Sequence, residues 1–387
     1  MTRSDTPPYD SRPRLRRAHR KSRKGCRECK KRHIKCDERR PQCANCVTAD
    51  RLCSFPEPSY SPNPLAPSTL PATIKIEQLE TQSPGNGAHF TAIHMALLHY
   101  AESHMEEYMA LQGSVQPIID IAINNALVAP YLLDQLLALS ALHLATTDAS
   151  TEPLYSYEAT ELQTRALELF NQARKDTSDT NCIAMFLFAS FLGIHILKET
   201  LCKHRDSLCD FVDSFMHYVH LHRGVRAVLA NGSWAVILQS DLKPLLSVAS
   251  FSDDVEAQPT HSEILELSNF LESSGSGTWS ISACQNALKW IQRVLNTSRL
   301  HPSRRDLGTH ATMAWPLLVS QEYIEALQQR RPEAIVVLAY YATALHRFRR
   351  YWVFGGAGSS LIRLISSNLD STWDNYMAWP ARVLSEG

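Results

Sequence analysis

Six cysteines in the N-terminal part of the chain have the clearest chemistry of any residues in this sequence. They follow the pattern C-x2-C-x6-C-x6-C-x2-C-x6-C, and the last three repeat the first three 17 positions later. In order they are Cys26, Cys29, Cys36, Cys43, Cys46 and Cys53. Each tetrahedral zinc ion needs four ligand bonds, so six thiolates satisfy two ions only if two sulfurs bridge the metals. The repeat therefore predicts a site for two Zn²⁺ ions per chain.

A disulfide framework, an iron–sulfur site and two separate zinc knuckles are the alternatives to a binuclear zinc site. A disulfide framework fits poorly, because we see no signal peptide and the residues that flank the cysteines are strongly basic. Two separate zinc sites would normally have ligand pairs that lie further apart in the sequence. The binuclear zinc interpretation is therefore preferred.

The six-cysteine spacing resembles that of the fungal zinc binuclear cluster (Zn2Cys6) transcription factors. The run from Gly25 to Glu38, GCRECKKRHIKCDE, looks most like the sterol uptake control subgroup. The family's first and fourth cysteines bridge, which would be Cys26 and Cys43. One zinc ion would then bind Cys26, Cys29, Cys36 and Cys43, and the other Cys43, Cys46, Cys53 and Cys26. The resemblance implies a DNA-binding regulator of RNA polymerase II genes, located in the nucleus.

The two halves of the cysteine repeat differ in charge. The six residues after Cys29 are almost all basic, whereas those after Cys46 are close to neutral. We therefore expect the first half to face double-stranded DNA, with a short helix over residues 27–33 in the major groove. Candidates for base contacts are Lys31, Arg32 and His33, and the family alignment favours the last two. Candidates for phosphate contacts are Lys30, Lys35, Arg39 and Arg40.

Charge compensation is an alternative role for each of these cations. Six thiolates and two Zn²⁺ ions carry a net negative charge, so nearby Lys and Arg side chains would stabilise the cluster even without DNA. Charge compensation could explain any one of these basic residues, but it explains poorly why so many of them occur together. A non-DNA-binding adaptor that uses the cluster only structurally is disfavoured for the same reason.

Charge is unevenly distributed along a chain whose formal net charge is zero. Residues 1–56 contain 17 Lys and Arg against 6 Asp and Glu, and the remainder contains 22 against 33. This asymmetry indicates a nucleic-acid-binding head on a body that does not bind nucleic acid. Residues 1–25 have too little apolar surface to fold, so we expect a disordered basic arm. The DNA-binding domain is predicted over residues 26–53.

A linker rich in proline is predicted over residues 54–90. Its prolines exclude helix across most of the segment. No heptad pattern for a dimerising coiled coil appears there. We therefore expect either a monomer on DNA or a dimer formed through the C-terminal domain.

Residues 91–387 show helical periodicity and no strand alternation, which predicts an all-α domain of about ten helices. An apolar face over residues 90–100 predicts the first helix, and residues 131–145, apolar nearly all round, should form a central one. The apolar run 182–197 is too short to span a membrane, so a buried core helix is expected. The other helices are expected near 158–174, 182–199, 207–230, 281–296, 318–328, 332–350 and 358–370.

This body also resembles the regulatory domain of the same family, on residues 130–145, 222–226 and 332–341. The sterol-responsive subgroup implies a pocket for a sterol or another apolar ligand between helices. Its candidate residues are Tyr351, Trp352, Trp373 and Trp379, for which ordinary core packing is the alternative. The short chain favours a regulator of a secondary-metabolite gene cluster, and the cysteine region favours a regulator of sterol uptake or synthesis.

Enzymatic chemistry is not expected in the helical body. We find no pairing of nucleophile and base and no cofactor-binding loop in the sequence. The histidines at positions 217, 220 and 222 are the best candidates for a further metal site, but a surface or core role is favoured for them.

Overall fold

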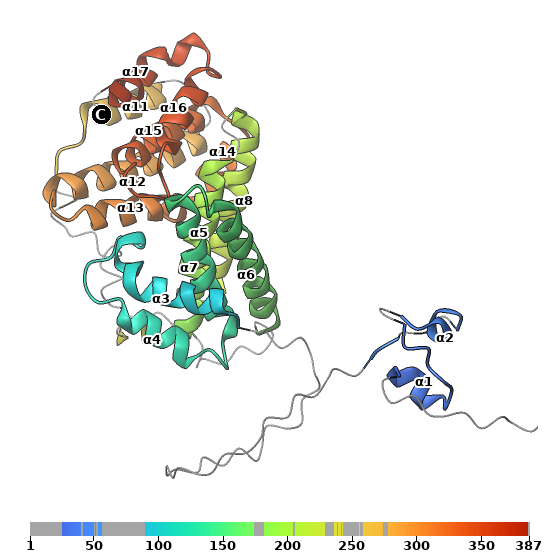
Figure 1. The fold of residues 1–387 in the computed structure, drawn as a ribbon. Helices are drawn as coiled ribbons and strands as arrows, with labels where there is room; N and C mark the ends of the chain where they lie inside the picture. The colour runs from blue at the N-terminus through green and yellow to red at the C-terminus, as the bar shows by residue number, and fades with distance from the viewer. Residues whose placement is uncertain are drawn as a thin grey trace, which may run out of the picture. The chain divides into compact units, whose positions relative to one another are not determined.

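The chain divides into two compact units, Met1–Asn86 and Gly87–Gly387, in the computed structural model (Figure 1). The structure describes residues 25–39, 42–49, 51, 53–55, 90–173, 182–203, 206–228, 236–237, 239–240, 242, 255, 258–273 and 278–385. The basic arm before residue 25, Arg40 and nearly all of the predicted linker lie outside the described residues. Each unit is treated separately below.

The first unit has two short helices, α1 (Arg27–Lys31) and α2 (Ala44–Val47), and they come from the two halves of the cysteine repeat. The buried residues that form its core are cysteines, with Cys53 and Phe55 partly buried against them. A core this small cannot offset the entropy of folding. The unit therefore depends on another source of cohesion, which the cysteine cluster provides.

The second unit is all-α, as predicted, and its described residues include no strand. Its N-terminal helices are α3 (Ala92–Tyr108), α4 (Gln116–Asn124), α5 (Pro130–Thr147), α6 (Glu152–Ala173), α7 (Cys182–Cys202) and α8 (Leu208–Val228). Its C-terminal helices are α11 (Ser262–Ser273), α12 (Thr278–Leu300), α13 (Arg305–Leu318), α14 (Gln321–Gln328), α15 (Pro332–Arg347), α16 (Ala357–Ser366) and α17 (Asp374–Ser385), with the 3₁₀ turn η4 (Ser371–Trp373) before α17. These exceed the predicted number of about ten.

Two helices form the centres of this unit. α5 packs against α3, α4, α6 and α7, and α15 packs against α12, α13, α14, α16 and α17. Figure 1 shows the two groups as the cyan-to-green and the orange-to-red halves of the bundle. Most residues of both central helices are buried. The prediction that residues 131–145 form a central helix is therefore confirmed.

Hydrogen bonds and ion pairs join the two groups of helices. The guanidinium of Arg223 on α8 donates to the carbonyl oxygens of Pro316 and Val319 at the end of α13. Arg330 pairs with Asp213 of α8 at 2.7 Å. Because α8 also packs against α7 of the first group, these contacts connect the two groups, in agreement with the single compact unit Gly87–Gly387.

Helix α7 is the one described helix that is long and apolar enough to pass as a membrane span. In the structure it packs against α5 and α8, and 61% of its most apolar window is buried. Its largest side chains, including Phe188 and Phe191, belong to the core. Burial inside the bundle accounts for its composition, in agreement with the expected core helix.

Four described helices of the second unit were not predicted: α4, α11, α13 and α17. The reason is clearest for α13, which contains Pro316. Proline cannot donate to the carbonyl four residues earlier, which belongs to Thr312. The hydroxyl of Tyr341, from α15, donates to that carbonyl instead, at 3.2 Å. A tertiary contact thus restores a bond that the local sequence forbids.

The close packing of α16 on α15 gives a first prediction. A Cβ atom added at Gly358 would overlap the backbone nitrogen of His346 and lie 2.6 Å from the carbonyl oxygen of Ala342. Because both are backbone atoms, they cannot move aside without shifting the helix. Gly358→Ala should lower the free energy of unfolding by about 1–3 kcal/mol, measured by urea denaturation.

The matched control is Gly356→Ala, because a Cβ there would meet no atom within 4 Å. Its free energy of unfolding should stay within about 0.5 kcal/mol of the parent. Equal stability of the two variants would contradict the close packing of α16 on α15.

Candidate metal centre and nucleic-acid interface

The six cysteine thiols gather into one cluster. The sulfur of Cys26 lies 3.7 Å from the sulfurs of Cys43 and Cys46, and the sulfur of Cys29 lies 3.6 Å from that of Cys43. A disulfide would need about 2.05 Å, and all six thiols are free. With Zn–S bonds of about 2.3 Å, the edge of a ZnS₄ tetrahedron is about 3.8 Å. The sulfur spacing therefore fits zinc coordination.

The two halves of the repeat build this cluster with the same backbone contacts. The backbone N–H of Cys26 donates to the sulfur of Cys36 at 3.4 Å, and the N–H of Cys43 donates to the sulfur of Cys53 at 3.2 Å. The sulfur of Cys26 also accepts the N–H of Cys29 at 3.3 Å, which caps α1. These N–H donors stabilise negative charge on sulfur, as thiolate ligands require.

Polar contacts outside the cysteines hold the halves together. The backbone N–H of Ala44 donates to the carboxylate of Asp37 at 3.1 Å, and the N–H of Arg27 donates to the carbonyl of Ser54 at 2.7 Å. These acceptors occupy equivalent positions, each directly after the third cysteine of its half. Arg51 of the second half also pairs with Glu28 of the first at 3.1 Å. These partners were not predicted from the sequence, although the offset of 17 positions in the repeat relates Asp37 to Ser54.

Crowding gives the thiols unequal acidities. Burial acts to raise the pKa of the Cys26 thiol, but hydrogen bonds from the Cys29 N–H and from neighbouring thiols outweigh it and lower that pKa to about 6. Burial and the neighbouring thiols instead raise the pKa of Cys46 to about 12. Not all six sulfurs can ionise together in the absence of a cation. Zinc needs all of them as thiolates, so metal binding must release protons.

Helix α1 is shorter than predicted, because it ends at Lys31 rather than at residue 33. His33 adopts a left-handed conformation with φ 55°. Its N–H donates to the carbonyl of Lys30 at 3.2 Å, and the N–H of Ile34 donates to the carbonyl of Cys29 at 3.1 Å. These two bonds define a Schellman C-cap. The chain therefore turns away from the helix axis between Arg32 and Ile34.

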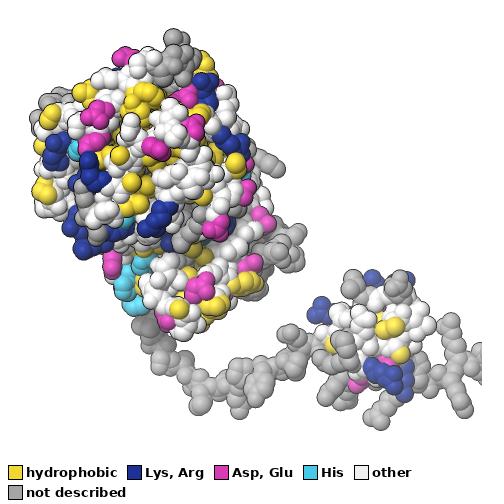
Figure 2. Space-filling view, turned by 90° about the horizontal axis from the view of Figure 1, so that it is seen from above, with side chains coloured by type: hydrophobic (Ala, Val, Ile, Leu, Met, Phe, Trp, Pro, Cys, Tyr) yellow, Lys and Arg dark blue, Asp and Glu magenta, His cyan; other side chains and the backbone are white. Residues whose placement is uncertain are grey.

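The predicted DNA-contact residues that the structure describes are all exposed: Lys30, Lys31, Arg32, His33, Lys35 and Arg39. Arg40 lies outside the described residues. Figure 2 shows Lys and Arg side chains gathered on the surface of this unit. In the second half the position of Lys30 is taken by Val47, which is 58% exposed, and that of Lys31 by Thr48. The repeat is thus nearly symmetric in backbone and asymmetric in charge.

The aromatic residues predicted to line a ligand pocket fall into two groups. The hydroxyl of Tyr351 and the indole N–H of Trp352 both donate to the carbonyl of Tyr108 at the end of α3, at 3.0 and 2.7 Å. Trp373 lies edge-on to Phe270 of α11, with ring centroids 5.4 Å apart. Trp379 packs on Tyr340 of α15, and none of the four predicted residues lines the cavity between α11 and α12. In their described contacts, Tyr351 and Trp352 therefore have different neighbours from Trp373 and Trp379.

The histidines on α8 do not form a metal-ligand group with other described residues, because the groups found lie within the cysteine region. The ring of His222 instead packs over Gly193 of α7, where an added Cβ would overlap it. Its Nδ1 atom lies 3.3 Å from the hydroxyl of Tyr218. His222 thus packs α8 closely against α7.

Comparison with known proteins agrees with this geometry. The fungal Zn(2)-Cys(6) binuclear cluster domain matches residues 24–61. A Zn(2)-C6 fungal-type transcription factor of Gibberella zeae is 24% identical, over 95% of this chain and 86% of that protein. The Zn(2)-C6 fungal-type transcription factor afumD of Aspergillus fumigatus is 26% identical, over 84% of each chain. Sterol uptake control protein 2 of Candida albicans is 52% identical over 40 residues, 10% of this chain and 6% of that protein.

The N-terminal unit is therefore a fungal binuclear zinc cluster domain, and its six clustered cysteines form the two-zinc site typical of such domains. Along most of its length the chain is similar to Zn(2)-C6 fungal-type transcription factors.

Removal of zinc gives the second prediction. Without metal the described residues of the first unit have only the cysteines and Phe55 as a core, whereas those of the second unit form a large core of their own. Treating the full chain with a zinc chelator under reducing conditions should abolish amide protection in α1 and α2. Protection in α5 and α15 should be unchanged. Hydrogen exchange read by mass spectrometry measures both in one sample, and persistent protection of α1 in metal-free protein would contradict the prediction.

Proposed function

We propose that this protein is a nuclear regulator of transcription that reads double-stranded DNA through the first half of its zinc module. The observation that carries the proposal is the charge asymmetry of two halves with matching backbones. Lys30, Lys31 and Arg32 are exposed in one half, and the uncharged Val47, Thr48 and Ala49 occupy the equivalent positions of the other. Charge compensation of a shared cluster would not require the cations to gather on one half, whereas contact with DNA does.

The cysteines are proposed to divide between the two metals with Cys26 and Cys43 as the bridging ligands. The support lies in the sulfur distances, because Cys26 lies close to Cys46 of the other half and Cys43 lies close to Cys29 of the first. Their sulfurs are also 3.7 Å apart. Cys29 and Cys36 would complete one site, and Cys46 and Cys53 the other. The zinc ions then fix the orientation of α1 relative to the rest of the module.

DNA contacts are proposed to divide by position on the module. Arg32 and His33 follow the C-terminal end of α1 at a sharp turn, so their side chains suit base edges in the major groove, with Lys31 beside them. Lys30, Lys35 and Arg39 are exposed around this turn and suit phosphate contacts. Arg40 is retained as a phosphate contact on sequence grounds alone.

Two pathways are proposed for this regulator. The match to the sterol uptake control protein spans 40 residues, which cannot include the helical domain. It therefore gives no support for a sterol pocket in that domain. The two relatives that match along most of the chain are Zn(2)-C6 fungal-type transcription factors. We retain control of a secondary-metabolite gene cluster as the first pathway to test and sterol control as the second. Binding to DNA as a monomer or as a dimer through the helical domain is compatible with both.

Separating base contacts from phosphate contacts tests the proposal. Glycine fits the left-handed position of His33, so His33→Gly should keep the fold and both zinc ions. It should lose about 1–3 kcal/mol of preference for the selected sequence over a scrambled one. Lys30→Gln should weaken both complexes and lower the slope of log affinity against log salt by about 1. Fluorescence anisotropy at several salt concentrations measures both quantities.

Val47→Gln is the matched control, because Val47 occupies the position of Lys30 in the second half. It should change neither the sequence preference nor the salt slope. An unchanged preference in zinc-loaded His33→Gly would remove this residue from base reading. A salt slope that stays unchanged in Lys30→Gln would contradict the assignment of DNA to the first half.

A further inference from the structure

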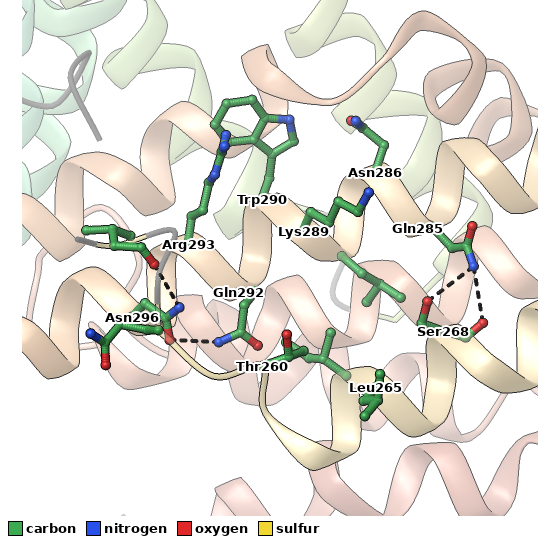
Figure 3. Close-up of a pocket in the computed structure, with 14 residues that line it drawn as sticks. Thr260, Leu265, Ser268, Gln285, Asn286, Lys289, Trp290, Gln292, Arg293 and Asn296 are labelled. Carbon is green, nitrogen blue, oxygen red and sulfur yellow. Dashed lines mark hydrogen bonds between the residues drawn. The ribbon is translucent and has the colours of Figure 1, made fainter. Parts of the chain in front are cut away.

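A cavity of about 420 Å³ opens between α11 and α12 in the helical domain, away from every residue assigned a role above (Figure 3). From α11 its lining includes Ile264, Leu265 and Ser268. From α12 it includes one face of the helix between Gln285 and Asn296. A volume of this size suits a small organic molecule.

A network of amide side chains holds the wall of the cavity. The Oε1 atom of Gln292 accepts the backbone N–H of His261 at 2.8 Å, and its Nε2 atom donates to the Oδ1 atom of Asn296 at 2.7 Å. The side-chain nitrogen of Asn296 donates to the carbonyl of Val255 at 3.1 Å. Both amides are nearly fully buried, at 8% and 2% exposed. Because the network satisfies these buried groups internally, the wall is formed before any ligand arrives.

A second hydrogen-bonded contact closes the other end. The side-chain amide of Gln285 donates to the hydroxyl of Ser268 at 3.2 Å, which joins α12 to α11 directly. Figure 3 shows this contact and the Gln292–Asn296 contact at opposite ends of the cavity. The separation of the two helices is therefore fixed along the cavity.

The charge of the lining is one-sided. Lys289 and Arg293 line the cavity, and its described lining contains no Asp or Glu. The guanidinium of Arg293 lies over the ring of Trp290, 4.4 Å from its centroid, which holds this cation in place. Lys289 is exposed and makes no ion pair or hydrogen bond within the described part of the chain. Lys289 thus offers the cavity a positive charge that no described residue neutralises.

Apolar side chains complete the lining. Ile264 and Leu288 are buried at its base, and Leu265 is 51% exposed beside it. A cation next to an uncovered apolar surface matches a ligand that has both an anionic group and a hydrocarbon part. A neutral sterol would leave the charges unused, and a small inorganic anion would leave the apolar surface uncovered.

We propose that this cavity binds an organic anion, a carboxylate with an apolar body. Its carboxylate pairs with Lys289 and Arg293, and its hydrocarbon part covers the exposed side chain of Leu265. This inference concerns the helical domain alone and does not rest on the proposed DNA contacts.

The test uses the full zinc-loaded chain with octanoate as the probe and octan-1-ol as its neutral counterpart. Hydrogen exchange read by mass spectrometry locates binding, and calorimetric titration measures affinity. Octanoate should protect residues 258–273 and 285–300, and octan-1-ol should bind about tenfold more weakly. Absence of protection there, or equal affinity of the two probes, would overturn the proposal.

Two variants test the role of charge. Lys289→Gln should weaken octanoate binding about tenfold and leave octan-1-ol binding unchanged, because only the anion uses the ammonium group. Lys289 is exposed and outside the core, so this variant should fold normally. Lys203→Gln is the control, because Lys203 is an exposed lysine after α7 that pairs with Glu199. Equal effects of the two variants on octanoate affinity would show that the cavity is not the site.

Discussion

The electrostatic attraction between two divalent metal ions and six thiolates is the interaction on which the rest of the DNA-binding unit depends. Five of the six cysteines are buried, and their sulfurs lie as close as 3.6 Å. Burying that much negative charge without cations would cost several kcal/mol per ion. Zinc binding makes burial of these thiolates favourable. The metal site therefore stabilises this unit as an apolar core stabilises a larger domain. The short helices and their caps are consequences of the metal site.

The two units of the chain are thus stabilised in different ways. The helical domain buries a large set of aliphatic and aromatic side chains and satisfies most of their polar atoms internally. Tyr351 and Trp352 illustrate this, because both donate to the same carbonyl at the end of α3. Asp134, buried in α5, is paired with Arg165 of α6 at 2.6 Å. A core of this kind does not depend on a metal ion for its cohesion.

Much of this structure follows from the sequence wherever a pattern is set by local chemistry. The cysteine spacing predicts the cluster, and the continuous apolar run of α5 predicts its central position. Other features depend on a backbone cap or on tertiary contacts that hydrophobic periodicity does not reveal. The left-handed conformation of His33 shortens α1, and the Tyr341 hydroxyl allows α13 to contain Pro316. The cavity between α11 and α12 is formed by residues more than 20 positions apart, for example Ser268 and Asn296, and is equally invisible to periodicity.

X-ray absorption at the zinc edge of the purified protein tests the central claim most directly. The account predicts two zinc ions per chain, a first shell made only of sulfur at about 2.3 Å, and scattering from a second metal held by shared thiolates. A shell that includes nitrogen or oxygen, or isolated zinc ions without a neighbouring metal, would contradict it.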